Sequence, residues 1–318
     1  MKNITRIGLT ALAGSLVASS VAVAGELSAT GSASMKVTNA SIEAAGKTVA
    51  MANSVYIAGS GELDNGMTVS MSFELDNGVD TGTGTGPFDN HSTTISSDSM
   101  GSLTVHGHGG DNAASALDGT AAGDLWDSTL GITAANDPAA AASGDNLVVY
   151  TLPTLAEGVS ISGSYASAGE GHEGSTALSL VYTGVEGLTV SLGKGDDNST
   201  VAVSADQTVM KASYAYGPVT LGYSNNDYDH TTAASDQEVS SFNLSYTVSD
   251  AISISYGEEK FEKSGVTSDI EVEGVTASYT SGGMTITAAS YEATNVDHSS
   301  TAANNDNEFW KLAASFAF

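Results

Sequence analysis

The sequence predicts an all-β protein: a 16-stranded, antiparallel, up-and-down transmembrane β-barrel whose third long loop folds inward. Three observations predict this fold. Apolar and polar residues alternate through most of the chain, tight turns alternate with longer polar connections, and an export leader precedes the first alternating segment. The composition, with 36 Gly and 12 Tyr but 4 Pro, also favours strands joined by tight turns over helices.

The first 24 residues have the pattern of a cleavable signal peptide. Lys2 and Arg6 come before the apolar run 7–21, which is too short to cross a bilayer, and Ala22-Val23-Ala24 matches a signal-peptidase site. A buried N-terminal helix would not need these features in this order. We therefore expect export, cleavage after residue 24 and a barrel formed by residues 25–318.

The charge of the exported chain argues against several partners. Removing Lys2 and Arg6 from the nine basic residues leaves seven Lys against 37 Asp and Glu, a net charge of about −30. Such a chain is not expected to bind nucleic acid or to carry a polybasic lipid anchor. It has no Cys for a disulfide framework, and beyond the leader no stretch approaches 18 consecutive apolar residues.

Alternation with a period of two defines the expected strands. In 66–76, Met67, Val69, Met71 and Phe73 alternate with Thr and Ser. The same pattern recurs, often closed by Tyr, in 158–166, 177–182, 187–193, 218–223, 242–248 and 251–256. Counted in this way there are about sixteen segments, each of roughly the nine to eleven residues that a tilted strand needs to cross a bilayer.

The connections alternate in length, as an even-stranded barrel with both termini on one side requires. Seven are short turns, at 64–66, 98–101, 156–158, 185–187, 217–218, 249–250 and 281–283. Eight are longer and polar, at 39–46, 77–91, 107–145, 167–174, 195–206, 225–237, 261–269 and 293–307. A soluble β-sandwich would also alternate, but the small polar faces here suit a water-filled lumen, and closure removes exposed strand edges.

These segments resemble the 16-stranded trimeric general porins of Gram-negative outer membranes, especially their alphaproteobacterial branch. The likeness lies in the stretches 26–37, 54–75, 101–127, 146–151 and 312–318, and elsewhere in pattern more than identity. It implies an outer-membrane homotrimer surrounded by lipid, with the last strand paired to the first. It also implies that Phe316 and Phe318, on the apolar face of the last strand, form the C-terminal signal read by the barrel assembly machinery.

The same resemblance makes 107–145 the loop that narrows the pore. We expect carboxylates at this constriction, where they would repel anions and concentrate cations. They are Asp111, Asp118, Asp124, Asp127 and Asp137. Roughly half of the loop carboxylates should instead cap turns or face bulk water, Asp145 most readily. No basic residue occurs between Lys47 and Lys194.

The opposite wall departs from the family pattern of a basic cluster, because the exported chain has no Arg. By alternation, the charged side chains on the lumen wall are expected to be Lys36, Lys211, Lys311, Glu62 and Glu74. Three amines cannot balance so many carboxylates. Each Lys could alternatively lie near a pore mouth.

The predicted function is passive transport: a general diffusion porin, not an enzyme, that passes ions and small hydrophilic solutes with a cation preference. No cofactor is expected. His106 and His108 are two residues apart but lack a third metal ligand. The acidic loops offer oxygen ligands of the kind that bind Ca²⁺, but they lack the D-x-D-x-D-G pattern.

Two other functions stay open from the sequence. A secreted, calcium-dependent β-roll adhesin would repeat a G-G-x-G-x-D nonapeptide, of which a single related stretch, 107–112, is present. An outer-membrane barrel enzyme would need a catalytic Ser/His or Asp/His group at one rim, and the six His are scattered.

Overall fold

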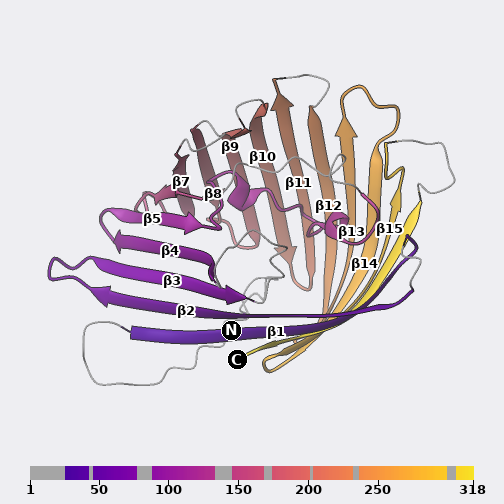
Figure 1. Cartoon of the computed structure of the whole chain (residues 1–318), viewed down its shortest axis with the longest axis horizontal. Coiled ribbons are helices and arrows are strands. Elements are labelled where there is room, and N and C mark those ends of the chain that lie inside the picture. The colour runs from indigo at the N-terminus through magenta and orange to yellow at the C-terminus, as the bar shows by residue number, and fades with distance from the viewer. Residues whose placement is uncertain are drawn as a thin grey trace.

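The computed structural model describes residues 26–42, 46–76, 88–132, 145–167, 174–200, 203–231, 236–298 and 306–318. Within these ranges, sixteen antiparallel strands form one closed barrel (Figure 1). The first eight are β1 (Glu26–Ala40), β2 (Thr48–Glu62), β3 (Thr68–Asp76), β4 (Phe88–Ser97), β5 (Gly101–His108), β6 (Leu147–Thr151), β7 (Val159–Ala166) and β8 (Ser175–Tyr182). The others are β9 (Leu188–Thr200), β10 (Val203–Tyr216), β11 (Val219–His230), β12 (Gln237–Ser249), β13 (Ile252–Lys263), β14 (Ile270–Ser281), β15 (Met284–Thr294) and β16 (Asn307–Ala317). The predicted fold class is confirmed.

The barrel closes between its first and last strands, as the resemblance implied. β1 and β16 pair from Ser32 opposite Ala317 to Ala40 opposite Phe309. The seam extends to the last residue, since the Phe318 N–H donates to the Gly31 carbonyl at 3.0 Å and the Gly31 N–H donates back at 2.6 Å. The signal peptide predicted at 1–24 lies outside the described residues.

Alternation divides every strand between an outer and an inner face. On β16 the outward side chains of Trp310 and Leu312 are exposed, while Phe309 between β1 and β15 is buried inside the barrel. The outer face is rich in exposed Leu, Val, Ile and Tyr, which is the surface expected of a lipid-facing wall. In the described parts of the chain, no helix is both long enough and apolar enough to span a membrane.

Two of the predicted loops are wrong. β9 and β10 fill most of 195–206, and β11 continues to His230, through the first six residues of the segment predicted as a loop at 225–237. The backbone ladder holds these polar residues, for example Asp206 opposite Asp196 and Asn226 opposite Val239. Ladder bonds need no apolar side chain, so the strands continue beyond their apolar bands. Lengths consequently range from five residues in β6 to 15 in β1.

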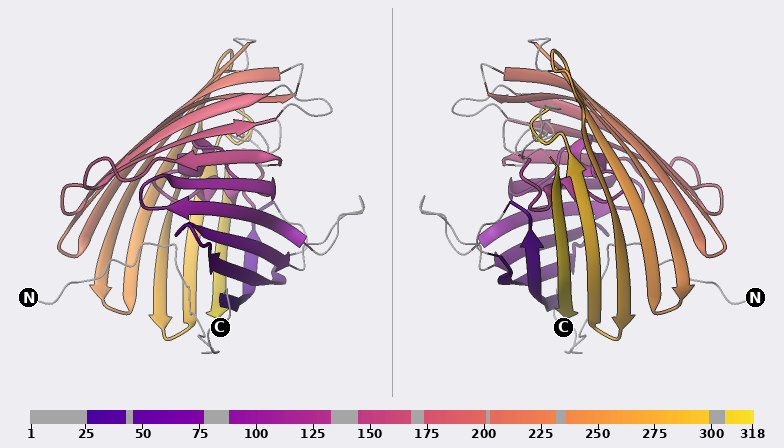
Figure 2. Two further views of the ribbon diagram at one scale, coloured as in Figure 1. Left: turned by 90° about the vertical axis from the view of Figure 1, so that its left-hand side faces the viewer. Right: turned by 90° about the vertical axis from the view of Figure 1, so that its right-hand side faces the viewer.

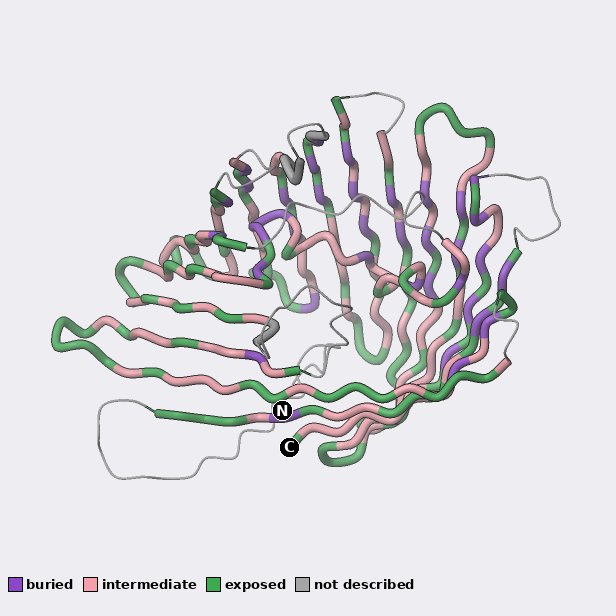
Figure 3. The backbone as a smooth tube through the Cα atoms, in the orientation of Figure 1, coloured by how far each residue is buried: buried purple, intermediate pink, exposed green. Residues whose placement is uncertain are grey.

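The wall of the barrel is uneven. Strands β3 to β8 have five to ten residues, whereas β9 to β16 have 11 to 14 (Figure 2). The buried residues concentrate on the long strands, toward the ends away from their short turns (Figure 3). They are buried because the segment after β5 packs against them from inside the barrel.

Candidate pore constriction

The segment that follows β5 folds into the barrel (Figure 1). We refer to 107–145 as the constriction loop; its described part contains two short 3-10 turns, η1 (Ser115–Leu117) and η2 (Leu125–Asp127). Side chains of several strands hydrogen-bond its backbone, among them Ser164 of β7 to Ala113 N–H (2.9 Å), Ser224 of β11 to Ala121 N–H (2.8 Å), Ser241 of β12 to Ala122 N–H (3.0 Å) and Asn307 of β16 to the Leu130 carbonyl (2.7 Å). The loop therefore follows the inner surface of the barrel from β7 to β16, and its predicted inward fold is confirmed.

An apolar cluster holds residues 125–130 of the loop. Leu125 and Leu130 are buried against inward-facing residues of β12 to β16. Trp126 meets the ring of Phe261 edge-on, with centroids 6.3 Å apart. Burial of such aromatic and aliphatic groups is the main source of packing energy in a core, so this cluster gives the loop a core of its own inside the barrel.

The predicted carboxylates occupy different environments on the loop. Asp111 and Asp127 are exposed, and Asp118 and Asp124 are half-buried. Asp137 lies outside the described residues. Asp124 has a left-handed backbone, with φ at 55°, and its Oδ1 accepts the Thr120 N–H at 2.9 Å. It therefore closes a turn, the role we expected for part of the set.

Asp118 is the carboxyl most strongly affected by its surroundings. Burial, together with the charges of Asp111 and Asp124, raises its pKa to about 6, although hydrogen bonds from Gln207 and Tyr228 oppose the shift. Because the pKa lies close to neutrality, this charge in the loop depends on pH.

The register places the three predicted lysines on the inner face. Lys36 pairs with Ala313 and is exposed. The ammonium groups of the other two have partners among the described residues. Lys211 donates to the Gly119 carbonyl of the loop, and Lys311 lies 5.4 Å from the ring centroid of Tyr291, a cation–π distance.

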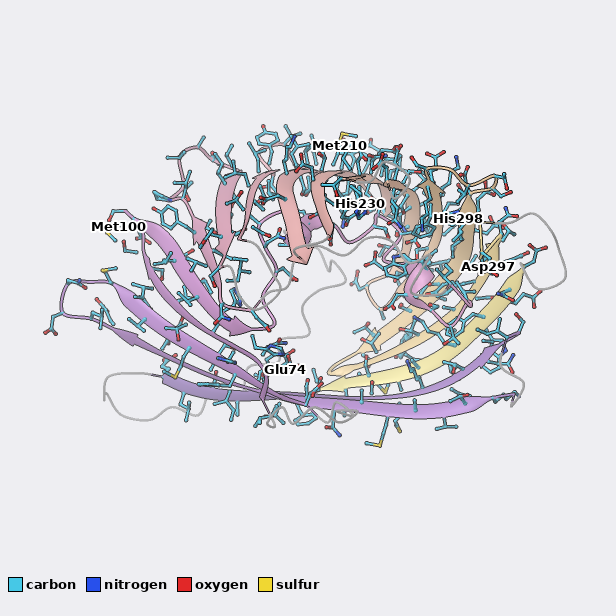
Figure 4. The ribbon with its side chains drawn as sticks, turned by 45° about the horizontal axis from the view of Figure 1, so that its top comes forward. Glu74, Met100, Met210, His230, Asp297 and His298 are labelled. Atoms are coloured by element: carbon cyan, nitrogen blue, oxygen red, sulfur yellow. The ribbon has the colours of Figure 1, made fainter. Side chains whose placement is uncertain are left out.

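Glu62 and Glu74 lie on the part of the barrel wall that faces the constriction loop across the lumen. Glu62 is exposed at the tight-turn end of β2, opposite Thr68. Glu74 points into the barrel, whereas Met210 lies on its outer surface (Figure 4). The Glu74 carboxylate is buried and accepts the Asn90 amide at 2.6 Å. This wall is acidic as well.

The two ends of the constriction loop are joined by a contact between a histidine and an aspartate. His108 Nδ1 lies 2.6 Å from Asp145 Oδ1, which also accepts the Gly109 N–H at 3.4 Å. A register shift between β4 and β5 puts His108 opposite His91 and His106 opposite Ser92. In the described part of the chain, no three His, Asp or Glu side chains are grouped as metal ligands would be.

Comparisons with known proteins agree with this architecture. A family model described as Gram-negative porin matches residues 8–299. Solved structures of similar fold include an anion-selective porin from Comamonas acidovorans, with 15% identity and a TM-score of 0.67 over 92% of this chain and 100% of that chain. Two mutants of Rhodopseudomonas blastica porin match with the same coverage, at 14% and 15% identity and TM-scores of 0.66 and 0.65. Comparison with curated protein sequences gave no match.

Proposed function

The chain belongs to the Gram-negative porin family, and we propose that it is a general diffusion porin for ions and small hydrophilic solutes, with a preference for cations. The closed barrel provides the water-filled path, and the seated loop narrows it on one side. Passive permeation involves no chemical step, so it requires no catalytic group.

One observation carries the proposed cation preference: the charges at the loop are unbalanced. Two of its carboxylates, Asp111 and Asp127, are exposed, and the Glu62 and Glu74 wall across the lumen adds negative charge. The ammonium of Lys211 is directed to the Gly119 carbonyl beneath the loop. A ring of carboxylates in a narrow passage concentrates cations and repels anions.

The remaining parts of the proposal concern location and assembly. We place the protein in the outer membrane as a homotrimer, with the apolar outer faces of its strands against lipid. Residues 1–24 would direct export, and Phe318, together with Phe316, would be read by the barrel assembly machinery. The backbone pairing of Phe318 with Gly31 in the closing seam supports a role for the C-terminal residues in barrel closure.

Reversal potential across a KCl gradient tests the proposal. Purified trimers in a planar bilayer should conduct in steps and reverse toward the K⁺ equilibrium potential. Replacing Asp111, Asp118, Asp124 and Asp127 with Asn should move the reversal potential toward zero. The matched control removes four charges from the outer wall: Glu258, Glu273, Glu292 and Glu308, each to Gln. This control should leave the reversal potential unchanged.

Three results would contradict the proposal. A reversal toward the Cl⁻ equilibrium potential would mean that Lys36, Lys211 or Lys311 sets the electric field in the pore. An equal shift in both quadruple variants would assign selectivity to overall surface charge. An absence of conductance from folded, heat-resistant oligomers would exclude an open pore.

A further inference from the structure

A buried glutamate on the inner wall binds the constriction loop at its centre. Glu259 of β13 is 2% exposed. Its carboxylate accepts hydrogen bonds from the Thr120 hydroxyl at 2.5 Å, the Leu125 N–H at 3.0 Å and the Trp126 N–H at 2.9 Å. We infer that Glu259 is the positioning residue that holds the loop and thereby fixes the open cross-section of the pore. This inference rests on the proposed diffusion function.

The carboxylate organises a whole turn and not a single contact. The Thr120 hydroxyl, which donates to Glu259, also accepts the Gly123 and Asp124 N–H groups at 3.1 and 2.8 Å. Leu125 and Trp126 begin η2, so their N–H groups have no partner within that turn. Without Glu259 these donors would be buried and unpaired, a state that favours movement of the turn toward water.

Glu259 belongs to a continuous row of wall residues that contact the loop. Along the register, Lys211 pairs with Ser224, Ser224 with Ser241, and Ser241 with Glu259. These four residues form the loop-binding row, and each hydrogen-bonds the loop backbone. Partners in one row share one face, so the row presents four loop contacts side by side on the inner wall.

The wall is also shaped to receive the loop. Gly193, Gly222 and Gly257 lie on the same inner face of β9, β11 and β13. A Cβ added at these glycines would lie 3.1 Å from the Cα of Ala114, 3.4 Å from the Cβ of Ala121 and 2.6 Å from the Cβ of Ala122, respectively. The loop approaches the wall where the wall has no side chain, so its position is specified by both sides.

The barrel ladder does not depend on the Glu259 side chain. The backbone of Glu259 pairs with Ser241 and Val272 in the same register as its neighbours. Loss of the carboxylate should therefore release the loop and leave the strands paired. This separates a positioning role from a purely structural one.

The test compares single-channel records of Glu259→Ala and Glu258→Ala in planar bilayers. Glu258 is the adjacent residue and points outward, so its substitution should leave the record as in the wild type. Glu259→Ala should lose the single stable conductance level and fluctuate among several levels. A folded Glu259→Ala protein with the wild-type level and noise would overturn the inference.

A cross-link provides the rescue. A Cβ at Gly222 would lie 3.4 Å from the Ala121 Cβ, close to the separation in disulfides of about 3.5–4.5 Å, and the chain has no Cys to compete. In the Glu259→Ala background, Ala121→Cys with Gly222→Cys should give one stable level when oxidised and several when reduced. If reduction of the disulfide does not change the conductance record, loop release is not the cause of the several levels.

Two further controls keep the outcomes separate. If Glu259→Ala does not fold, Thr120→Val removes the hydroxyl that donates to Glu259 and leaves every residue of the barrel wall unchanged. Several conductance levels in Thr120→Val would support the inference, and a wild-type record would overturn it. Wild-type protein without conductance would refute the proposed function itself. If the wild type conducts and Glu259→Ala gives the same single-channel record, only the role of Glu259 is refuted.

Discussion

Glu258 and Glu259 are neighbours in the sequence and lie in opposite environments. Glu259 faces the interior, where the constriction loop surrounds it with donors. Glu258 faces outward and pairs with Glu273, which pairs with Glu292, which in turn pairs with Glu308. We call these four carboxylates the outer glutamate row. The pleat of one strand thus puts one carboxylate where it is needed for structure and the other beside like charges.

The two sites balance their charge differently. The inner carboxylate relies on three hydrogen-bond donors that cannot be replaced by water unless the loop moves. The outer row is exposed to solvent, and the Tyr256 hydroxyl lies 2.5 Å from Glu258 and 2.6 Å from Glu273. Solvent and salt screen the remaining repulsion. Substitutions should therefore have opposite signs at the two sites.

The largest effect is expected from removing the inner carboxylate. Glu259→Ala should lower the free energy of unfolding by about 2–3 kcal/mol, because three hydrogen bonds to a buried carboxyl group are lost and their donors are left unpaired. Glu258→Ala should change it by less than about 0.5 kcal/mol, as expected for an exposed position. Urea titrations of both variants in detergent, followed by tryptophan fluorescence, measure the difference. Equal losses would show that Glu259 has no special role in stability.

The sequence predicts the strands but not these environments. Period-two patterns locate the apolar bands, and Phe318 in the seam agrees with a closing last strand. The patterns fail at 195–206 and 225–237, where strands with two polar faces look like loops. Beyond an apolar band, only backbone pairing shows that the strand continues.

The site was predicted less completely than the fold. The Asp-rich loop was found because long acidic connections stand out, but the loop-binding row was missed. Ser224 and Ser241 look like ordinary small lumen residues, and their role depends on contacts from a segment more than 100 residues earlier. One signal was available: adjacent acids such as Glu258 and Glu259 in a strand must put one carboxylate inward.

A second prediction concerns the glycines of the inner wall. Gly257→Ala would put a Cβ 2.6 Å from the Ala122 Cβ, so the loop must move and stability should fall by about 1 kcal/mol. The control is Gly59→Ala on the outer face of β2, where the nearest atoms would be 3.7 Å away. The same urea titrations should show no loss in the control. A stable Gly257→Ala protein with unchanged conductance would mean that the constriction loop can shift at this contact without loss of stability or function.

A third prediction extends the contrast between loop and outer wall to pH. The pKa of Asp118 is raised to about 6, so its carboxyl gains a proton as pH falls through 6, whereas an exposed Asp keeps its charge to about pH 4. Cation preference should therefore weaken in a step between pH 7 and 5. Reversal potentials recorded across this range should lose that step in Asp118→Asn. A step that survives in Asp118→Asn would assign the titration to another group.

The smallest effect is expected on the outer glutamate row. Glu273 lies between two like charges, Glu258 and Glu292, and directly opposed like charges destabilise a sheet. Glu273→Gln should therefore raise the free energy of unfolding by about 0.5 kcal/mol at low ionic strength. The gain should disappear near 1 M salt, where screening acts within about 3 Å. Urea titrations at both salt concentrations test the sign: a loss of stability at low salt would mean that the hydrogen bond between Glu273 and Tyr256 outweighs the repulsion along the row.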